Sequence, residues 1–585
     1  MHEWSLEPLF SSYESKEFKD AIKEIEKDSL RALEFAEKDL SETNQALIRI
    51  EEYISLSSKI RTNFLKCFAY STLRLATDAL DEDASKYMNK LQGMSSKLTP
   101  FSTKFSKWLP TLNNLDELIE TSTLLKEHEY FLKSIVDNSK HVLSDKEEAI
   151  ISKMQQTSSS AWGQLHGLLT STLEVEFDGK TITLSDVRNL AMSKDKEVRK
   201  KAYYAEIKAL EKIELSIAYA LNGVKGEVNT LSEMRGFESP LAQAVYNSRM
   251  KQTTLDSLIQ AMREYLPHFH RYLKRKAELL GHKNGLPFYD LFAPVGESSK
   301  EFSVDEAMNF VFDNFKSFSP DLEEMARRAY KENWIDFLPK KGKRGGAFCS
   351  NLHPIKQSRV LTNFSGSFSN VITLSHELGH AYHGEQIFKE SILNATYTMP
   401  VAETASTFCE TIVKNAALKE ADKEEKIFIL EQSLKGSTGV IVDILSRFIF
   451  EKEVFDKRKS TPLNPRMLKE MMLSAQKEAY GEALDHDFLH PYMWVVKGHY
   501  YRGGLSFYNF PYAFGLLFAK GIYAKFKSQG ESFVDDVKLL LQKTGQMSVE
   551  DVASLVGIDL TNVDFWRSSL EVIKEEIDLF IELTE

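Results

Sequence analysis

Cysteine is scarce in this chain, which has Cys67, Cys349 and Cys409 as its only three cysteines among 585 residues. Cysteines so few and so far apart cannot form the disulfide framework of a small secreted protein. Residues 1–5 lack the basic and then apolar layout of a signal peptide, and no apolar run reaches the length of about 18 residues that a membrane-spanning helix needs. We therefore expect a soluble cytoplasmic protein that does not bind membranes.

Basic residues are also in the minority, and the formal net charge of −11 argues against nucleic acid as a partner. The one basic cluster, residues 340–344, is interpreted mainly as a solvated loop. Two common catalytic motifs are absent as well: the phosphate loop Gly-x-x-x-x-Gly-Lys-Ser/Thr and the nucleophile elbow Gly-x-Ser-x-Gly. Neither a phosphate loop nor a serine nucleophile is therefore expected.

The sequence does contain the pattern His-Glu-x-x-His, at His376, Glu377 and His380, in a stretch without proline. Positions four apart share one face of a helix, so the two imidazoles can bind one zinc ion at about 2.0–2.1 Å. Glu377 can then accept a proton from a water molecule. The alternative is a pair of surface histidines on an ordinary helix, because the pattern also arises by chance.

A catalytic zinc ion needs a third protein ligand and an open position for water. Glu403 is the favoured third ligand, because Pro400 is typical of the first turn of a helix that would carry it. Glu410 lies seven positions later, on the same face, and either orients a ligating imidazole or is itself the ligand.

His383 shares the face of His376 but lies about 10.5 Å further along the helix axis, too far to bind the same ion. We expect it to support a ligand or to face the substrate. The metzincin pattern is excluded, since it requires glycine at position 383 and histidine at position 386, where this chain has His383 and Gln386.

The region near the C-terminus offers hydrogen-bond donors for an oxyanion that develops when water attacks an amide. His499 is the first choice, followed by Tyr508 and then Tyr512, and Tyr501 remains a further option. The alternative for each tyrosine is an ordinary core position, because the surrounding run is strongly apolar.

Several blocks together resemble the oligoendopeptidase F branch of the thimet oligopeptidase-like zinc metallopeptidase family. They are residues 343–348, 361–366, the helix with His-Glu-Leu-Gly-His, residues 401–406, 499–501 and 507–515. Their order and spacing agree over about residues 190–580, and the chain departs from the pattern at Tyr500 and at 509–511. The resemblance implies a zinc-dependent oligopeptidase whose site lies in a deep channel that admits short unstructured peptides.

Helical patterns dominate, which predicts a mainly α, multi-lobed zincin with a small β-sheet beside the metal helix. We place the domain boundary near residue 190, with an N-terminal helical lobe at 1–190 and a catalytic domain at 191–585. One long helix is expected from about 195 to 231. Residues 173–184 predict a β-hairpin around Asp178-Gly179-Lys180, which we expect to mark the seam between the lobes.

Two short strands are predicted before the metal helix, at residues 346–350 and 359–364. Gly346 and Ala347 begin the first of them. An edge strand there can pair with the backbone of an extended peptide, or it can simply complete a small sheet.

The sequence thus favours a metalloendopeptidase with one Zn²⁺ ion and short peptides as substrates. A zinc exopeptidase is the alternative, with Arg502 as an anchor for a terminal carboxylate. A catalytically silent peptide-binding protein is a third possibility. Oligomeric state has no signature, and a monomer is favoured over an oligomer.

Overall fold

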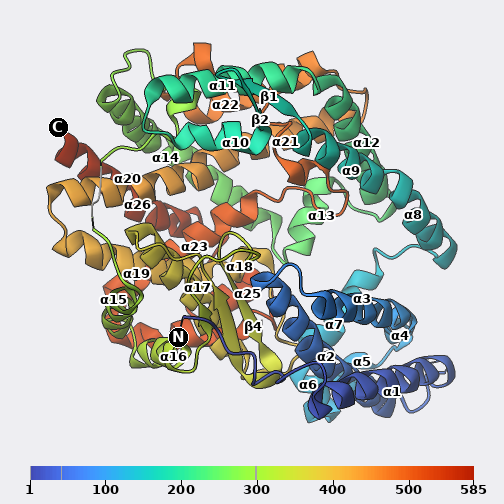
Figure 1. The fold of residues 1–585 in the computed structure, drawn as a ribbon. Coiled ribbons are helices and arrows are strands. Elements are labelled where there is room, and N and C mark those ends of the chain that lie inside the picture. Colours follow the sequence, from blue (N-terminus) through green and yellow to red (C-terminus); the bar gives the residue numbers. More distant parts are fainter. Residues whose placement is uncertain (1, 41, 297–299) are drawn as a thin grey trace. The chain divides into compact units, whose positions relative to one another are not determined.

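A computed structural model describes residues 2–40, 42–296 and 300–585 of the chain (Figure 1). Met1, the first residue of the segment compared with signal peptides, lies outside these ranges. Helices make up most of the described structure, and the strands form one two-stranded and one three-stranded sheet. The mainly α fold class predicted from the sequence is confirmed.

The chain forms two compact units, each assembled from three stretches of sequence. The first unit comprises residues 1–141, 300–416 and 525–557, and the second comprises the rest. A single boundary near residue 190 therefore does not describe these units, and the proposed domain division stays a prediction.

The first unit contains the long N-terminal helices, the three-stranded sheet and the predicted metal helix. Its elements are α1 Lys16–Lys38, α2 Ala46–Thr77, α3 Glu82–Lys97, α4 Thr99–Trp108, α5 Leu115–Thr121, α6 Thr123–Glu127, α7 Glu129–Ser139, α15 Val304–Lys316, α16 Pro320–Lys331, β3 Ile335–Asp336, β4 Phe348–Leu352, β5 Gln357–Leu361, α17 Phe368–Ile387, α18 Met399–Ala402, the start of α19 Thr404–Glu420, α24 Val534–Lys543 and α25 Val549–Ser554.

The predicted metal helix is α17, and its ends and faces follow from its sequence. Ser367 caps the N-terminus, since its side chain accepts from the backbone N–H of Asn370 while the Asn370 side chain accepts from the backbone of Ser367. Leu374 and Leu378 are fully buried. The helix packs on β4 and β5, which lie beside it in Figure 1, so a small sheet does adjoin the metal helix.

The sheet beside α17 has the strand order β3-β5-β4. β5 pairs parallel with β3 and antiparallel with β4, so β4 is an edge strand of this sheet. β4 begins two residues later than predicted and β5 two residues earlier, and the short β3 was not predicted at all. Gly346, with a φ of 79°, and Ala347 precede β4 rather than belonging to it.

The second unit is helical apart from a hairpin. Its elements are α8 Asp145–Thr157, α9 Ser159–Ser171, β1 Glu174–Phe177, β2 Lys180–Thr183, α10 Leu184–Asn189, α11 Lys196–Glu211, α12 Glu214–Met234, α13 Pro240–Asn247, α14 Gln252–Leu279, α20 Lys423–Thr438, the π-helix η5 Gly439–Asp443, α21 Ile444–Arg458, α22 Pro465–Tyr480, the start of α23 Phe510–Gln529 and α26 Val563–Thr584. Short 3₁₀ helices include η2 Leu190–Met192, η3 Phe288–Asp290 and η8 Gly498–Tyr501.

The predicted hairpin is confirmed as β1 and β2, joined by Asp178 and Gly179 with φ angles of 46° and 76°. Two consecutive positive φ values are typical of the type I′ turn that suits a two-residue hairpin loop. The prediction of a single helix over about 195–231 is wrong, because α11 ends at Glu211 and α12 starts at Glu214. A break of this kind needs neither glycine nor proline, so the local sequence carried no signal for it.

No helix in the described ranges combines the length and the apolar character required to cross a membrane.

Candidate metal centre and neighbouring groups

Two helices of the first unit bring the predicted metal ligands together. His376 and His380 lie one turn apart on α17, with their Nε2 atoms 3.2 Å from each other. Pro400 occupies the first turn of the short helix α18, and Glu403 follows at its C-terminal end, just before α19. The Glu403 Oε2 atom lies 3.3 Å from Nε2 of His376 and 3.4 Å from Nε2 of His380. Among the described residues, these three form the one cluster with metal-binding spacing.

The spacing of these three atoms fits a bound metal ion. Ligands at about 2.0–2.1 Å from a tetrahedral zinc ion lie roughly 3.3–3.4 Å from one another. The three observed separations, 3.2, 3.3 and 3.4 Å, match that value. Two imidazoles and one carboxylate are also a donor set typical of catalytic zinc sites, which leave one position open.

The surrounding carboxylates favour positive charge at this point. Burial lowers the pKa of His376, but its hydrogen bonds to Glu403 and Glu410 raise it more, to about 10. Burial likewise raises the pKa of Glu403, but the two histidines hold it well below its usual range. A site that stabilises a proton in this way also suits a metal cation, which competes with protons for the same ligands.

Glu410 contacts the Nδ1 side of the His376 ring, whereas Glu403 lies near Nε2. Its Oε1 atom accepts a hydrogen bond from Nδ1 of His376 at 2.6 Å. A histidine that donates through Nδ1 keeps the lone pair of Nε2 free for a metal ion. This contact suits the orienting role, the first of the two roles considered for Glu410 from the sequence, with Glu403 as the candidate third ligand.

Glu377 is only 6% exposed and sits between the two ligating histidines in sequence. Burial raises the pKa of its carboxyl group, although the charges of His376 and His380 lower it. A raised pKa improves a carboxylate as a proton acceptor near neutral pH. The group therefore has the electrostatic setting of a general base.

Gly379 allows the segment that carries Glu403 to approach α17. A Cβ atom at this position would lie 2.5 Å from the Cα of Ser406 and 2.6 Å from the carbonyl oxygen of Ala405. Any larger residue would push the start of α19 away, and Glu403 immediately precedes this helix. The glycine in the motif therefore sets the distance between the histidines and their carboxylate partner.

His383 lies in the interior of the first unit. It is fully buried, its ring stacks on Tyr397 at a centroid distance of 4.1 Å, and its Nε2 atom hydrogen-bonds the Thr544 hydroxyl at 2.9 Å. Burial lowers the pKa of His383 to about 3, so the ring is neutral. These contacts give His383 a packing role between α17 and the segment after α24.

The first unit also holds Gly346 and Ala347 next to the sheet. The carbonyl oxygen of Gly346 accepts a hydrogen bond from the side chain of Asn363 at 2.8 Å, which ties the segment before β4 to the segment after β5. The side chain of Asn351 on β4 donates to the carbonyl oxygen of His380 at 3.1 Å. This link between sheet and metal helix was not apparent from the sequence.

The second unit brings together three of the predicted oxyanion donors. The ring centroid of His499, on η8, lies 6.4 Å from that of Tyr508, which lies 5.4 Å from that of Tyr512. Burial, together with the charges of Arg447 and other cations, lowers the pKa of His499 to about 3. Its Nε2 atom is buried without a hydrogen-bond partner among the described residues. A neutral ring with an unsatisfied nitrogen has the capacity to bind a ligand atom.

Tyr501 has a different environment. It is 2% exposed, its hydroxyl donates to the carbonyl oxygen of Trp494 at 2.9 Å, and its ring stacks on His166 at 3.8 Å. One face of its ring and its hydroxyl are therefore engaged within the second unit. The structure gives Tyr501 the environment of a core residue.

A buried ion pair anchors the segment that carries Tyr508. Glu451 on α21 pairs with Lys225 on α12 at 2.6 Å, and the two side chains are 0% and 1% exposed. The same carboxylate accepts hydrogen bonds from the backbone N–H of Phe507 and the side chain of Asn509, each at 3.1 Å. Glu451 thus holds both neighbours of Tyr508.

Phe507 itself has a φ of 53°, a left-handed conformation that is costly for a bulky residue. The hydrogen bond from its backbone to Glu451 offsets part of this cost. Sequence reasoning missed Glu451 and Lys225, since they are 226 positions apart and no local pattern connects them.

The fold and the site together define a metallopeptidase of the His-Glu-x-x-His type. The model of peptidase family M3 matches residues 189–572, and that of oligopeptidase F matches residues 112–174. The first match covers more than half of the sequence, and the chain belongs to peptidase family M3. The resemblance to oligoendopeptidase F found from the motifs is thereby confirmed.

Individual relatives agree with this assignment. Oligopeptidase PepF of Bacillus subtilis (strain 168) is 23% identical over 599 residues, which cover 99% of this chain and 87% of that protein. Group B oligopeptidase PepB of Streptococcus agalactiae serotype III (strain NEM316) is 25% identical over 555 residues, covering 92% and 90%.

Solved structures share the fold. A structure from Chlamydophila abortus has a TM-score of 0.86 at 21% identity and covers 100% of this chain and 98% of that one. Oligoendopeptidase-F from Enterococcus faecium has a TM-score of 0.70 at 20% identity, covering 96% and 99%. At these identities the two structures establish the fold alone.

Proposed function

We propose that the protein is a zinc-dependent endopeptidase that hydrolyses internal bonds of short unstructured peptides. The observation that carries this proposal is the set of three ligand atoms 3.2–3.4 Å apart, on His376, His380 and Glu403. When bound, a zinc ion lowers the pKa of a coordinated water to about 7 and polarises a carbonyl group.

Glu377 is the general base and acid. It accepts the proton of the attacking water and returns it to the leaving amine, so the reaction needs no covalent intermediate. The buried position of Glu377 and its raised pKa support this role.

His499 and Tyr508 are proposed to donate hydrogen bonds to the oxyanion, with Tyr512 as the second tyrosine. Donors fixed before the reaction stabilise the transition state more than the ground state. The unsatisfied Nε2 atom of His499 and the anchoring of both neighbours of Tyr508 support this assignment.

The backbone of an extended peptide is proposed to pair with the edge strand β4. Pairing through main-chain hydrogen bonds provides affinity that depends little on side chains, as an oligopeptidase with varied substrates requires. The free cysteines Cys67, Cys349 and Cys409 support a reducing compartment, and we propose the cytoplasm.

Replacement of Glu377 by glutamine tests the mechanism. The variant should keep one equivalent of zinc, measured by elemental analysis, and lose about 10²–10⁴-fold or more in turnover of a fluorogenic oligopeptide. Glu385→Gln on the same helix is the matched control and should retain activity. Turnover by Glu377→Gln near the wild-type level would reject the role of this residue.

A peptide blocked at both termini separates endopeptidase from exopeptidase. An endopeptidase cleaves the blocked and free forms alike, and mass spectrometry identifies the internal bond. Cleavage of the free form alone would favour an exopeptidase in which Arg502, a neighbour of His499 in the second unit, binds the terminal carboxylate. Binding of both peptides to zinc-loaded protein without any cleavage would indicate a catalytically silent carrier.

A further inference from the structure

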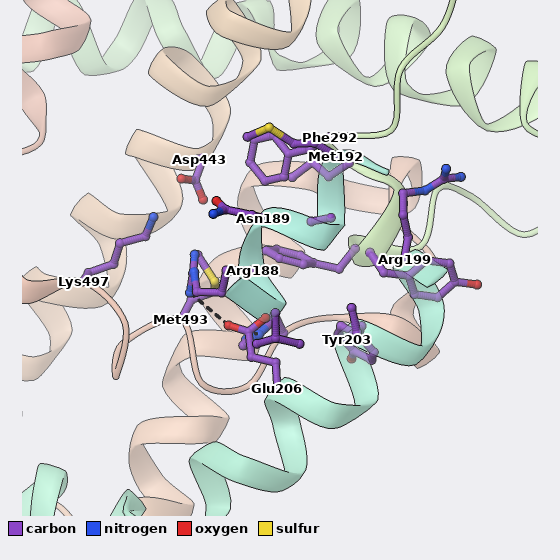
Figure 2. A pocket seen from close by; sticks show the side chains of 17 residues that line it. Arg188, Asn189, Met192, Arg199, Tyr203, Glu206, Phe292, Asp443, Met493 and Lys497 are labelled. Atoms are coloured by element: carbon purple, nitrogen blue, oxygen red, sulfur yellow. Dashed lines mark hydrogen bonds and ion pairs between the residues drawn. The ribbon is translucent and has the colours of Figure 1, made fainter. Parts of the chain in front are cut away.

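The second unit contains a cavity that the proposed peptide hydrolysis does not use. Its volume is about 270 Å³, and α10, η2, α11, η3, the end of η5 and the loop before η8 form its walls (Figure 2). None of its lining residues is a predicted metal ligand or an oxyanion donor. Sites for small molecules are typically concave, mostly apolar and equipped with a few polar groups.

The apolar part of the cavity reaches the protein surface. Met192 and Phe292 are 64% and 37% exposed, which is unusual for large apolar side chains, and both lie on the same side of the cavity in Figure 2. Phe288 and Leu291 line the cavity and are buried. Exposed apolar side chains that adjoin a cavity favour an apolar ligand, because binding removes their surface from water.

Most charges around the cavity are already paired. Arg188 forms an ion pair with Glu206 at 3.0 Å, and Arg199 pairs with Asp290 at 2.6 Å. Asp443 is paired with Arg447, which lies outside the lining. Within each of these three pairs, the positive and the negative charge neutralise each other.

Lys497 is the exception. Within the described residues, its ammonium group forms no hydrogen bond and no ion pair, although it faces the cavity from the side of Asp443 (Figure 2). Burial lowers the pKa of Lys497 to about 8, with Asp443 and Glu206 opposing that effect and Arg447 and Arg188 adding to it. The group is therefore still largely protonated near pH 7. A partly buried cation without a partner is costly unless an anion binds to it.

We propose that this cavity binds a small monocarboxylate with an apolar body, whose carboxylate pairs with Lys497 and whose body contacts Met192 and Phe292. A single negative charge balances the ammonium group of Lys497, whereas a zwitterion or a neutral molecule does not. The site is a ligand-binding site in addition to the peptidase centre.

Calorimetric titration of the zinc-loaded enzyme tests the proposal with 3-phenylpropanoate as the probe. Saturable binding with one site per chain is expected. The neutral isostere 3-phenylpropanamide and the cation 3-phenylpropylamine should each bind about 10-fold more weakly or worse, because a charge-assisted hydrogen bond is lost. Equal binding of the acid and the amide would overturn the assignment of Lys497.

Variants locate the site. Lys497→Gln should raise the dissociation constant of the probe by about 10-fold or more, while the matched control Lys208→Gln, at an exposed position of α11, should leave it unchanged. Met192→Trp, at an exposed position that tolerates a large residue, should block the cavity and abolish binding even if Lys497→Gln folds poorly.

A carboxylate can also bind a catalytic metal ion, and the variants separate this case. Binding at the metal centre would be unaffected by both Lys497→Gln and Met192→Trp, and that result would overturn the proposal. Absence of saturable binding to the wild-type enzyme at millimolar probe would do so as well.

Discussion

The helices that carry the candidate metal ligands and the segment around Tyr508 hold their side chains in different ways. His376 and His380 are fixed by the regular geometry of α17, so their separation follows from helix periodicity. Tyr508 lies in an irregular segment whose neighbours depend on a buried ion pair from distant helices and on a residue with positive φ. Regular elements thus position ligands through local rules, whereas loops need anchors supplied by the tertiary structure.

The largest expected effect is in the metal-binding region. His380→Ala should remove the metal ion and reduce peptide hydrolysis to the background rate, since two remaining ligands hold zinc poorly. Elemental analysis and a fluorogenic peptide measure both quantities, and His141→Ala in the same unit is the control. An active, metal-loaded His380→Ala protein would show that α17 does not carry the metal centre.

Loss of the ion pair between Glu451 and Lys225 should lower the stability of the protein. Glu451→Gln leaves Lys225 as an unpaired buried charge, which we expect to lower the free energy of unfolding by about 3–5 kcal/mol. The double variant Lys225→Met/Glu451→Gln removes this charge and should recover most of the loss. Urea denaturation measures both values. If the single variant is as stable as the wild type, the ion pair does not hold the segment.

His499→Phe removes a proposed donor and preserves an aromatic ring. We expect kcat to fall by about 10²–10³ with KM and zinc content unchanged, the usual effect of losing one oxyanion donor. Because the pKa of His499 is about 3, its ring is neutral at the pH of the assay, and the ratio of wild-type to variant rates should be constant from about pH 6 to 8. His486→Phe is the control, and an increase in KM alone would indicate substrate binding rather than transition-state stabilisation.

The smallest expected effect concerns Glu410 and its hydrogen bond to the candidate ligand His376. Glu410→Gln weakens the hydrogen bond to His376 and should reduce zinc affinity by about 10–100-fold, measured by competition with a chelator. Once saturated with zinc, this variant should be nearly as active as the wild type. Glu420→Gln, at the exposed end of the same helix, is the control. A loss of activity that excess zinc does not restore would assign Glu410 a direct part in catalysis.

Local patterns explain which parts of the structure were predictable. The metal helix, the helix start at Pro400 and the hairpin at Asp178-Gly179 all depend on residues within a few positions of one another. The close approach of the two histidines to Glu403 was expected from the motif, and the structure brings these groups together.

Contacts between distant residues explain what was missed. The interior position of His383 depends on Thr544, more than a hundred residues later, and the anchor of Tyr508 depends on Lys225 and Glu451. The break between α11 and α12 depends on packing as well, because residues 212–213 are not helix breakers. Periodicity cannot reveal any of these features.

The contact at Gly379 changes how the motif should be understood. The two unspecified positions of His-Glu-x-x-His are not interchangeable here, because Leu378 fills the interior while Gly379 touches the backbone of the neighbouring helix. A methyl group at position 379 would lower the affinity for the metal ion without changing any ligand residue. Transfer of only His376, Glu377 and His380 to another helix would therefore omit Gly379. The lack of a side chain at this position lets Glu403 come close to the two histidines.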